Sequence, residues 1–308
     1  MTLETITKQE ADFKINKIKQ EGMEQVKKLS YNSLDTIQLI FGEPVIYELN
    51  IEGILFEIFA HFEETSPHLI VFNPARVNRK RHKLPFFHRW TWAIKSGYSS
   101  IVMNDPTLYL DNLEIGWFQG LEKKHYLPIA CKIIMFLTEQ LNLFPKDILF
   151  CGSSAGGFSS LMMAGFIRQS SAFVINPQTN AFNFSKLRVE ELLKASFSGI
   201  NRKEARKKYA TRFSIPDYYR SQNYVPRIFY MQNVSDFNHW TNHYLPLIET
   251  IGEMIGDDQG SNWFNKLLIQ SEIYCHGNHV EGTKAISYEH WIKRAETFME
   301  LRNVGKSP

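Results

Sequence analysis

The 308-residue sequence lacks the features that mark several classes of protein. Its three cysteines, Cys131, Cys151 and Cys275, are odd in number and widely spaced, which fits neither a disulfide framework nor a zinc site. The longest apolar run, residues 161–167, is far shorter than the roughly 20 residues of a membrane-spanning helix. The first residues are polar and charged, unlike a secretory signal. We therefore expect a cytoplasmic protein without an integral membrane segment.

Neither sign of charge dominates the composition. A formal net charge of +3 is too small to predict a nucleic-acid partner, and none is expected. Positive residues are nevertheless concentrated in two segments, Arg76–Lys83 and Arg202–Arg212. Two interpretations stay open for these segments: solvated surfaces, or parts of a site for an anionic ligand.

The composition is that of a globular protein, with 44% apolar and 22% charged residues. Apolar residues at roughly helical spacing predict an amphipathic helix over residues 3–30. We therefore assign residues 1–40 to an N-terminal helical extension and residues 41–308 to the main domain.

Short apolar runs alternate with helix-like segments in the main domain. A sequence that turns at Asn50–Gly53 predicts a β-hairpin over residues 44–62. Continuously apolar runs predict strands of a mostly parallel, doubly wound α/β sheet covered on both faces. They fall at residues 68–74, 99–106, 147–152, 171–178, 227–233 and 267–275, with helices expected at 126–141, 156–169, 239–254 and 286–301. Residues 182–225 interrupt the alternation and are expected to form a helical cap over the carboxyl edge of the sheet.

The sharpest motif is the hexapeptide Gly152-Ser-Ser-Ala-Gly-Gly157, which fits G-x-S-x-G with Ser154 at its centre. It directly follows a predicted strand and directly precedes a predicted helix, as a nucleophile elbow requires. Gly152 and Gly156 supply the small residues that such a sharp turn needs. The motif lacks the lysine of a Walker loop and the G-x-G-x-x-G of a dinucleotide loop.

A serine nucleophile needs a base and an acid that orients the base. In this type of fold the chain order is serine, acid, histidine. Asp236 follows one predicted strand, and both His276 and His279 follow the last one. We prefer His279, because a Gly-Asn turn precedes it and lets the ring swing over the sheet edge. Weaker alternatives for the acid are Glu272, Asp257 and Asp258.

Backbone and side chains near this centre complete the predicted site. The oxyanion hole is expected to use the N–H of Ala155 and a second N–H after the strand at 68–74, either that of Ala75, which we prefer, or that of Arg76. Substrate-binding candidates are Arg76, Arg79, Trp90, Gln178 and His239. His239 and His243 have a spacing that metals use, but no third ligand follows at a suitable interval, so no metal is expected.

These residues resemble the α/β-hydrolase superfamily, on GSSAGG with Ser154, VSD with Asp236 and GNH with His279. A narrower resemblance is to hydrolase-like proteins of bacterial capsule and surface-polysaccharide gene clusters, including capsule O-acetyltransferases. Its carriers are the turn INPQ, which ends at Gln178, and the spacing D-x-x-H from Asp236 to His239. In those proteins the base commonly follows glycine, whereas this chain has Asn278.

The resemblance implies an O-acetyltransferase that moves an acetyl group through acyl-Ser154 to a hydroxyl of a capsular or surface polysaccharide. No bound cofactor is expected, and acetyl-CoA is the implied donor. Two alternatives stay open: a serine esterase acting on a glycan or a small-molecule ester, and a non-catalytic subunit of a polysaccharide biosynthesis complex. The sequence also leaves open a homo-oligomer.

Overall fold

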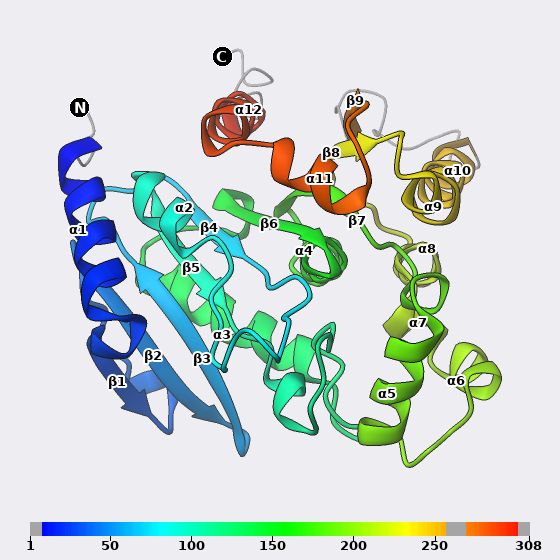
Figure 1. The fold of residues 1–308 in the computed structure, drawn as a ribbon, viewed down its shortest axis with the longest axis horizontal. Coiled ribbons are helices and arrows are strands. Elements are labelled where there is room, and N and C mark those ends of the chain that lie inside the picture. Colours follow the sequence, from blue (N-terminus) through cyan, green and yellow to red (C-terminus); the bar gives the residue numbers. More distant parts are fainter. Residues whose placement is uncertain (1–7, 257–268, 301–308) are drawn as a thin grey trace.

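The computed structural model describes residues 8–256 and 269–300, in which nine strands form one mixed sheet (Figure 1). The strand order is β1-β2-β3-β5-β4-β6-β7-β8-β9, and the pairs β2–β3 and β3–β5 are antiparallel while the others are parallel. The strands are β1 (Lys28–Tyr31), β2 (Pro44–Ile51), β3 (Ile54–His61), β4 (Leu69–Phe72), β5 (Ser99–Met103), β6 (Ile148–Ser154), β7 (Ser171–Pro177), β8 (Arg227–Asn233) and β9 (Ile269–Tyr274).

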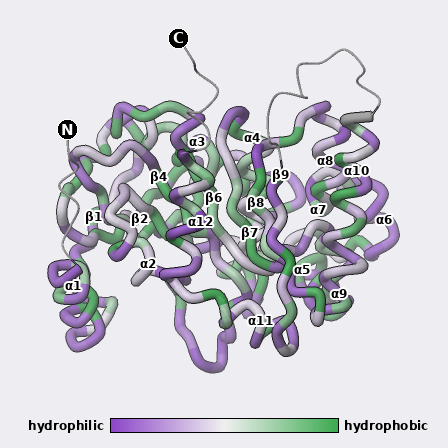
Figure 2. The backbone as a smooth tube through the Cα atoms, turned by 90° about the horizontal axis from the view of Figure 1, so that it is seen from above, coloured by the Kyte–Doolittle hydropathy of each residue, from purple (hydrophilic) through white to green (hydrophobic). Residues whose placement is uncertain are grey.

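Helices cover both faces of this sheet, because residues on alternate positions of the strands face two separate cores. On β6, Phe150 faces the core beneath α3 and α4, whereas Cys151 faces the core beneath α1, α2 and α12. The helices are α1 (Lys8–Glu21), α2 (Trp90–Lys95), α3 (Tyr126–Gln140), α4 (Ala155–Phe166), α5 (Lys186–Ser196), α6 (Arg202–Lys208), α7 (Ala210–Phe213), α8 (Ile215–Gln222), α9 (Phe237–His239), α10 (Leu245–Gly256), α11 (His279–Ala285) and α12 (Tyr288–Glu300), with a π-helical turn at Trp240–Tyr244. Figure 2 shows the hydrophobic residues gathered on the central strands and many hydrophilic ones on α1.

The predicted α/β architecture is confirmed, including the hairpin of β2 and β3. The predicted N-terminal helix is too long, however. Helix α1 ends at Glu21, where Gly22 adopts a φ of 98°, and Lys28–Tyr31 form an edge strand paired with β2. Residues 8–40 are therefore only partly helical, and β1 joins them to the main sheet.

The insertion between β7 and β8 is helical as expected, and it forms α5 to α8. Helix α8 packs against α4 and α10, so the insertion covers the same face of the sheet as α4. Figure 1 places α5, α6 and α7 at the opposite end of the molecule from α1. Within the residues that the structure describes, no helix is both long and apolar enough to cross a bilayer.

Candidate active site

Ser154 lies at the sharp turn between β6 and α4, with φ 52° and ψ −120°, a conformation that non-glycine residues rarely adopt. The chain passes so close to its neighbours there that two glycines are required. A methyl group on Gly152 would collide with the backbone of Gly156, and one on Gly156 would lie 2.5 Å from the Asn73 carbonyl oxygen. The predicted strand–turn–helix geometry around Ser154 is thus present.

Asp236 follows β8 and His279 begins α11, and their side chains meet at the carboxyl edge of the sheet. Nδ1 of His279 lies 2.5 Å from Oδ2 of Asp236. The other carboxylate oxygen, Oδ1, accepts a hydrogen bond from the backbone N–H of His239 at 3.2 Å. Burial raises the pKa of Asp236, but the polar contacts with His239 and His279 outweigh it and hold the pKa well below its usual range. The ionised carboxylate keeps the proton of His279 on Nδ1, so Nε2 is free to act as a base.

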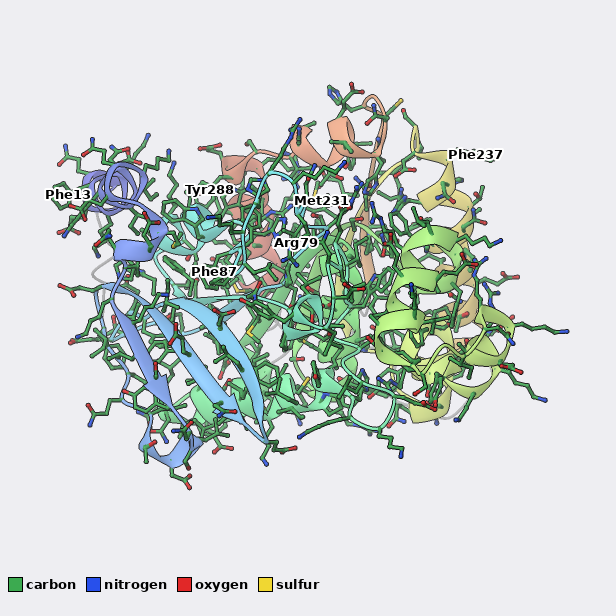
Figure 3. The ribbon with its side chains drawn as sticks, turned by 60° about the horizontal axis from the view of Figure 1, so that its bottom comes forward. Phe13, Arg79, Phe87, Met231, Phe237 and Tyr288 are labelled. Carbon is green, nitrogen blue, oxygen red and sulfur yellow. The ribbon has the colours of Figure 1, made fainter. Side chains whose placement is uncertain are left out.

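The loop after β9 brings His279, not His276, to the acid. The Asn278 side chain accepts hydrogen bonds from two N–H groups in the first turn of α11, which places His279 at the first helical position. His276 is exposed, and its backbone is held by the Asn233 side chain. Asn278, which replaces the glycine of the resembled proteins, therefore serves as a helix cap. Phe237, the residue after Asp236, projects to solvent and is 73% exposed (Figure 3).

Glu272, a weaker candidate for the acid, is engaged away from His279. Glu272 accepts hydrogen bonds from His290 at 3.0 Å and Arg294 at 2.7 Å, which holds β9 to α12. Asp257 and Asp258 lie outside the described residues.

A second histidine supports the acid and the base. The His239 ring stacks on His279 with ring centres 4.0 Å apart, and its Nδ1 lies 2.8 Å from Asp236 Oδ2, out of line for a hydrogen bond. The ring of His243 follows at 4.8 Å, and its Nδ1 accepts the Thr179 N–H. Burial lowers the pKa of His239 and lowers that of His243 to about 3, so both rings are neutral at pH 7. His239 is 2% exposed, which places it behind Asp236 and His279 instead of on a substrate surface.

Asp236, His239 and His279 also form a cluster whose donor atoms lie within 4.8 Å of one another. A tetrahedral zinc ion with ligand distances of about 2.1 Å holds its ligand atoms about 3.4 Å apart. The carboxylate oxygen here lies 2.5 and 2.8 Å from the two Nδ1 atoms, well below that separation. These three atoms therefore stand too close together to be ligands of one zinc ion, and the contact with His279 is a hydrogen bond.

Gln178 donates a hydrogen bond to the nucleophile. Its Nε2 lies 3.2 Å from Ser154 Oγ, and its Oε1 accepts from Trp117 Nε1 at 2.7 Å, which fixes the end of the amide that faces the serine. Trp117 is fully buried and has a φ of 51°, a strained conformation for a tryptophan. Among the described residues, no hydrogen bond joins Ser154 to His279. Such a bond often tightens only when substrate binds.

The two predicted oxyanion-hole residues lie together. Ala155 is the first residue of α4, so its N–H is one of those that a helix leaves unbonded. Ala75 and Ala155 line the same small cavity, together with Trp117 and Asp105. Burial raises the pKa of Asp105 to about 6, although the N–H groups of Phe118 and Thr107 hydrogen-bond to its carboxylate and oppose the rise. Asp105 and Trp117 therefore place a carboxyl group and an indole ring in the cavity beside the predicted oxyanion hole.

The two basic segments hold the chain segment 105–124, which carries Trp117. Arg76 pairs with Glu114 at 2.5 Å, and Arg79, in the centre of Figure 3, donates to the carbonyls of residues 108 and 113. From the cap, Arg212 donates to the carbonyls of residues 119, 121 and 122. These guanidinium groups are engaged within the protein, and a substrate role for Arg76 and Arg79 stays a prediction.

Trp90 packs edge-on against Phe59 of β3 at 6.0 Å, in the core beneath α2. Strand β3 is three places from β6 in the sheet, so this contact gives no support to sugar stacking next to Ser154. Arg89 was not predicted from the sequence; it directly precedes α2 and donates to Ser153, the neighbour of Ser154. A single arginine outside the charged runs has no pattern that would have revealed it.

No protein-family model and no curated protein matches the chain. Solved structures do match its fold. The capsule O-acetyltransferase of Neisseria meningitidis serogroup A aligns with a TM-score of 0.57 at 15% identity, over 82% of this chain and 96% of that one. A mutant of that protein in complex with CoA aligns with a TM-score of 0.59, at 15% identity over 81% of this chain and 96% of that one. The carboxylesterase Cest-2923 of Lactobacillus plantarum aligns with a TM-score of 0.56 at 10% identity, over 86% of this chain and 100% of that one. This chain has the α/β-hydrolase fold, as its resemblance implied.

Proposed function

We propose that this chain is a serine acyltransferase in which Ser154, His279 and Asp236 form a catalytic triad. One observation carries the proposal: Asp236 and His279, found from chain order, lie 2.5 Å apart at the sheet edge where Ser154 ends β6. The strained backbone of Ser154 adds support, because strain of this kind persists mainly at functional sites.

The chemistry follows from these positions. His279 Nε2 takes the Ser154 proton while Oγ attacks the carbonyl carbon of the donor, and the N–H groups of Ala155 and Ala75 stabilise the oxyanion. The bond to the leaving group breaks, and His279 returns the proton to it. His279 then takes the proton of an acceptor hydroxyl, whose oxygen attacks the carbonyl carbon of acyl-Ser154. The bond from that carbon to Ser154 Oγ breaks, and His279 returns the proton to Oγ, which restores the free serine. Asp236 stabilises the positive imidazole in both halves of the reaction.

For the partners in this reaction, we propose acetyl-CoA as the donor and a hydroxyl of a bacterial capsular or surface polysaccharide as the acceptor. The motif resemblance supports both, as does the structural likeness to a capsule O-acetyltransferase that has been solved with CoA. Transfer in place of hydrolysis requires that water be kept from the acyl-enzyme, and the cap helices α5 to α8 are the candidates for this.

The test is the intact mass of the protein after incubation with acetyl-CoA, beside the Ser154→Ala variant. The proposal predicts a gain of one acetyl group with release of free thiol, and neither in the variant. An acetyl group on the variant as well would place the modification elsewhere and contradict the proposal.

A serine esterase uses the same triad and is the second candidate. It would give Ser154-dependent cleavage of an acetyl ester without an adduct from acetyl-CoA. A non-catalytic subunit is the third candidate. One observation favours it: the Ser154 hydroxyl is hydrogen-bonded to Gln178 and not to His279. It predicts neither an adduct nor ester cleavage.

A further inference from the structure

Arg89 lies beside the nucleophile elbow and has no acidic partner among the described residues. Its Nη2 donates to Ser153 Oγ at 3.1 Å, and its guanidinium lies 4.9 Å from the centre of the Trp92 ring. Arg89 directly precedes α2, and therefore lies at the carboxyl edge of the sheet, as Ser154 does. The side chain is only partly accessible, and burial lowers the pKa of Arg89 to about 10. Neither Ser153 nor Trp92 neutralises the charge.

Four other arginines of the chain pair with acids, and Arg79 and Arg212 instead donate several hydrogen bonds to backbone carbonyls. Arg76 and Arg188 pair with Glu114, Arg220 pairs with Glu253, and Arg294 pairs with Glu272. Arg89 differs from them in its backbone too, with a left-handed φ of 60° at the start of α2. Such a conformation persists only where the surrounding structure enforces it. The guanidinium is therefore held at the elbow at a cost, without an internal counter-charge.

We propose that Arg89 binds an anionic group, a carboxylate or a phosphate, on the acyl acceptor. A partly buried cation without an acidic partner favours a bound anion. The planar guanidinium can hold a carboxylate or a phosphate with two hydrogen bonds. This inference rests on the proposed function, since it assigns an acceptor to the same site. It adds that the acceptor is a glycan with a negative group close to the acylated hydroxyl.

The position of Arg89 favours the acceptor over the donor. Arg89 touches the residue next to Ser154, and the acceptor hydroxyl must also lie beside acyl-Ser154. The phosphates of CoA are separated from its thioester by the whole pantetheine arm. They would therefore lie well away from Arg89 when the acyl group is at Ser154.

Two matched esters test this inference: 3-acetoxybenzoate, which carries a carboxylate, and methyl 3-acetoxybenzoate, which is neutral. In the cleavage of either ester, the phenol leaves from the place that an acceptor occupies. We expect the ratio of kcat/KM for the charged ester to that for the neutral one to fall at least about tenfold in Arg89→Met. Arg89→Lys keeps part of the preference, because it keeps the charge. The control Arg220→Met removes an exposed positive charge from the cap and leaves the ratio unchanged. An unchanged ratio in Arg89→Met would overturn the inference.

A binding measurement separates this inference from the proposed function. Calorimetric titration of 3-acetoxybenzoate into the Ser154→Ala protein needs no catalysis. We expect measurable binding of the charged ester, weaker binding of its methyl ester, and loss of the difference when Arg89→Met is added. If Ser154 is unreactive but this pattern holds, the proposed function fails and the anion site stands. If Arg89→Met instead weakens CoA and leaves 3-acetoxybenzoate unaffected, the acceptor site is overturned.

Discussion

The two sides of Ser154 differ in how they are prepared. On the acid–base side, formed by Asp236, His279 and His239, the carboxylate and imidazole are joined at 2.5 Å, yet no hydrogen bond reaches the serine. On the amide side, formed by Gln178 and Trp117, the Gln178 amide is fixed by the Trp117 indole and already donates a hydrogen bond to Ser154 Oγ at 3.2 Å. The difference indicates that each side is fixed by its own contacts. The link that remains to be made is the one between Ser154 and His279.

The largest expected effect comes from removing the base. His279→Ala should lower the rate of ester cleavage or acyl transfer by about 10³-fold or more, since Ser154 then has no proton acceptor. His276→Ala is the matched control, because it changes an exposed histidine three residues away on the same loop. Equal losses in the two variants would mean that the acid–base side has been wrongly assigned.

Substitutions on the amide side, at Gln178 and Trp117, should have the next largest effect. Gln178→Leu leaves the triad in place but takes away the N–H that would stabilise negative charge on Oγ when the acyl bond breaks. We therefore expect kcat to fall by about 10²-fold with little change in KM. Trp117→Phe keeps the ring and loses the N–H that orients Gln178, so its loss should have the same form and be smaller. If Gln178→Leu changes KM alone, Gln178 acts in binding and not on the reacting oxygen.

A smaller effect is expected behind the triad. His239→Phe keeps an aromatic ring against His279 but loses the polar contact with Asp236, and we expect a loss of about tenfold or less in kcat/KM. His239→Ala removes the ring as well and should cost more. If the two variants behave alike, the stacking contact has no effect on the base.

The last effect concerns folding and its dependence on pH, and leaves the reaction itself aside. Because burial lowers the pKa of His243 to about 3 whereas an unfolded histidine titrates near about 6.5, the unfolded chain binds the extra proton between these values. Stability therefore rises with pH in this window, and His243 contributes about 1.4 kcal/mol per pH unit to the slope. His243→Asn keeps an acceptor for the Thr179 N–H and removes the titration. Urea unfolding between pH 4 and 6 should show a shallower slope for this variant, and an equal slope would contradict the buried neutral ring.

The sequence predicted the side of the site that depends on local pattern. Two local features carried the prediction: the strand–turn–helix pattern around Ser154, and the positions of Asp236 and His279 directly after strands. The structure brings Asp236 and His279 together. On the amide side Gln178 was predicted, as a substrate-binding residue, but its link to Trp117 was not, because Trp117 reaches Gln178 through a segment held by contacts distant in sequence. The contacts of the basic runs were not predictable for the same reason: Arg212 and Arg79 hold that segment through its carbonyls, and their role toward a ligand stays a prediction.

The fold was predicted best where the apolar runs were continuous. The parallel strands β4 to β9 each fall within or beside a predicted run. The edge strand β1 was missed, because Lys28–Tyr31 are exposed or half-buried and their polar residues fit a helix face equally well. Tertiary pairing with β2 decided between the two.

The most direct test of the central claim is the rate at which a fluorophosphonate labels the protein, with the modified residue located by mass spectrometry. This reagent reacts with an activated serine and needs no knowledge of the substrate. We predict labelling at Ser154 alone in the native protein, and a loss of at least about 10²-fold in the rate in His279→Ala, with His276→Ala unaffected. Labelling at an equal rate in His279→Ala, or no labelling of Ser154 in the folded native protein, would contradict the account.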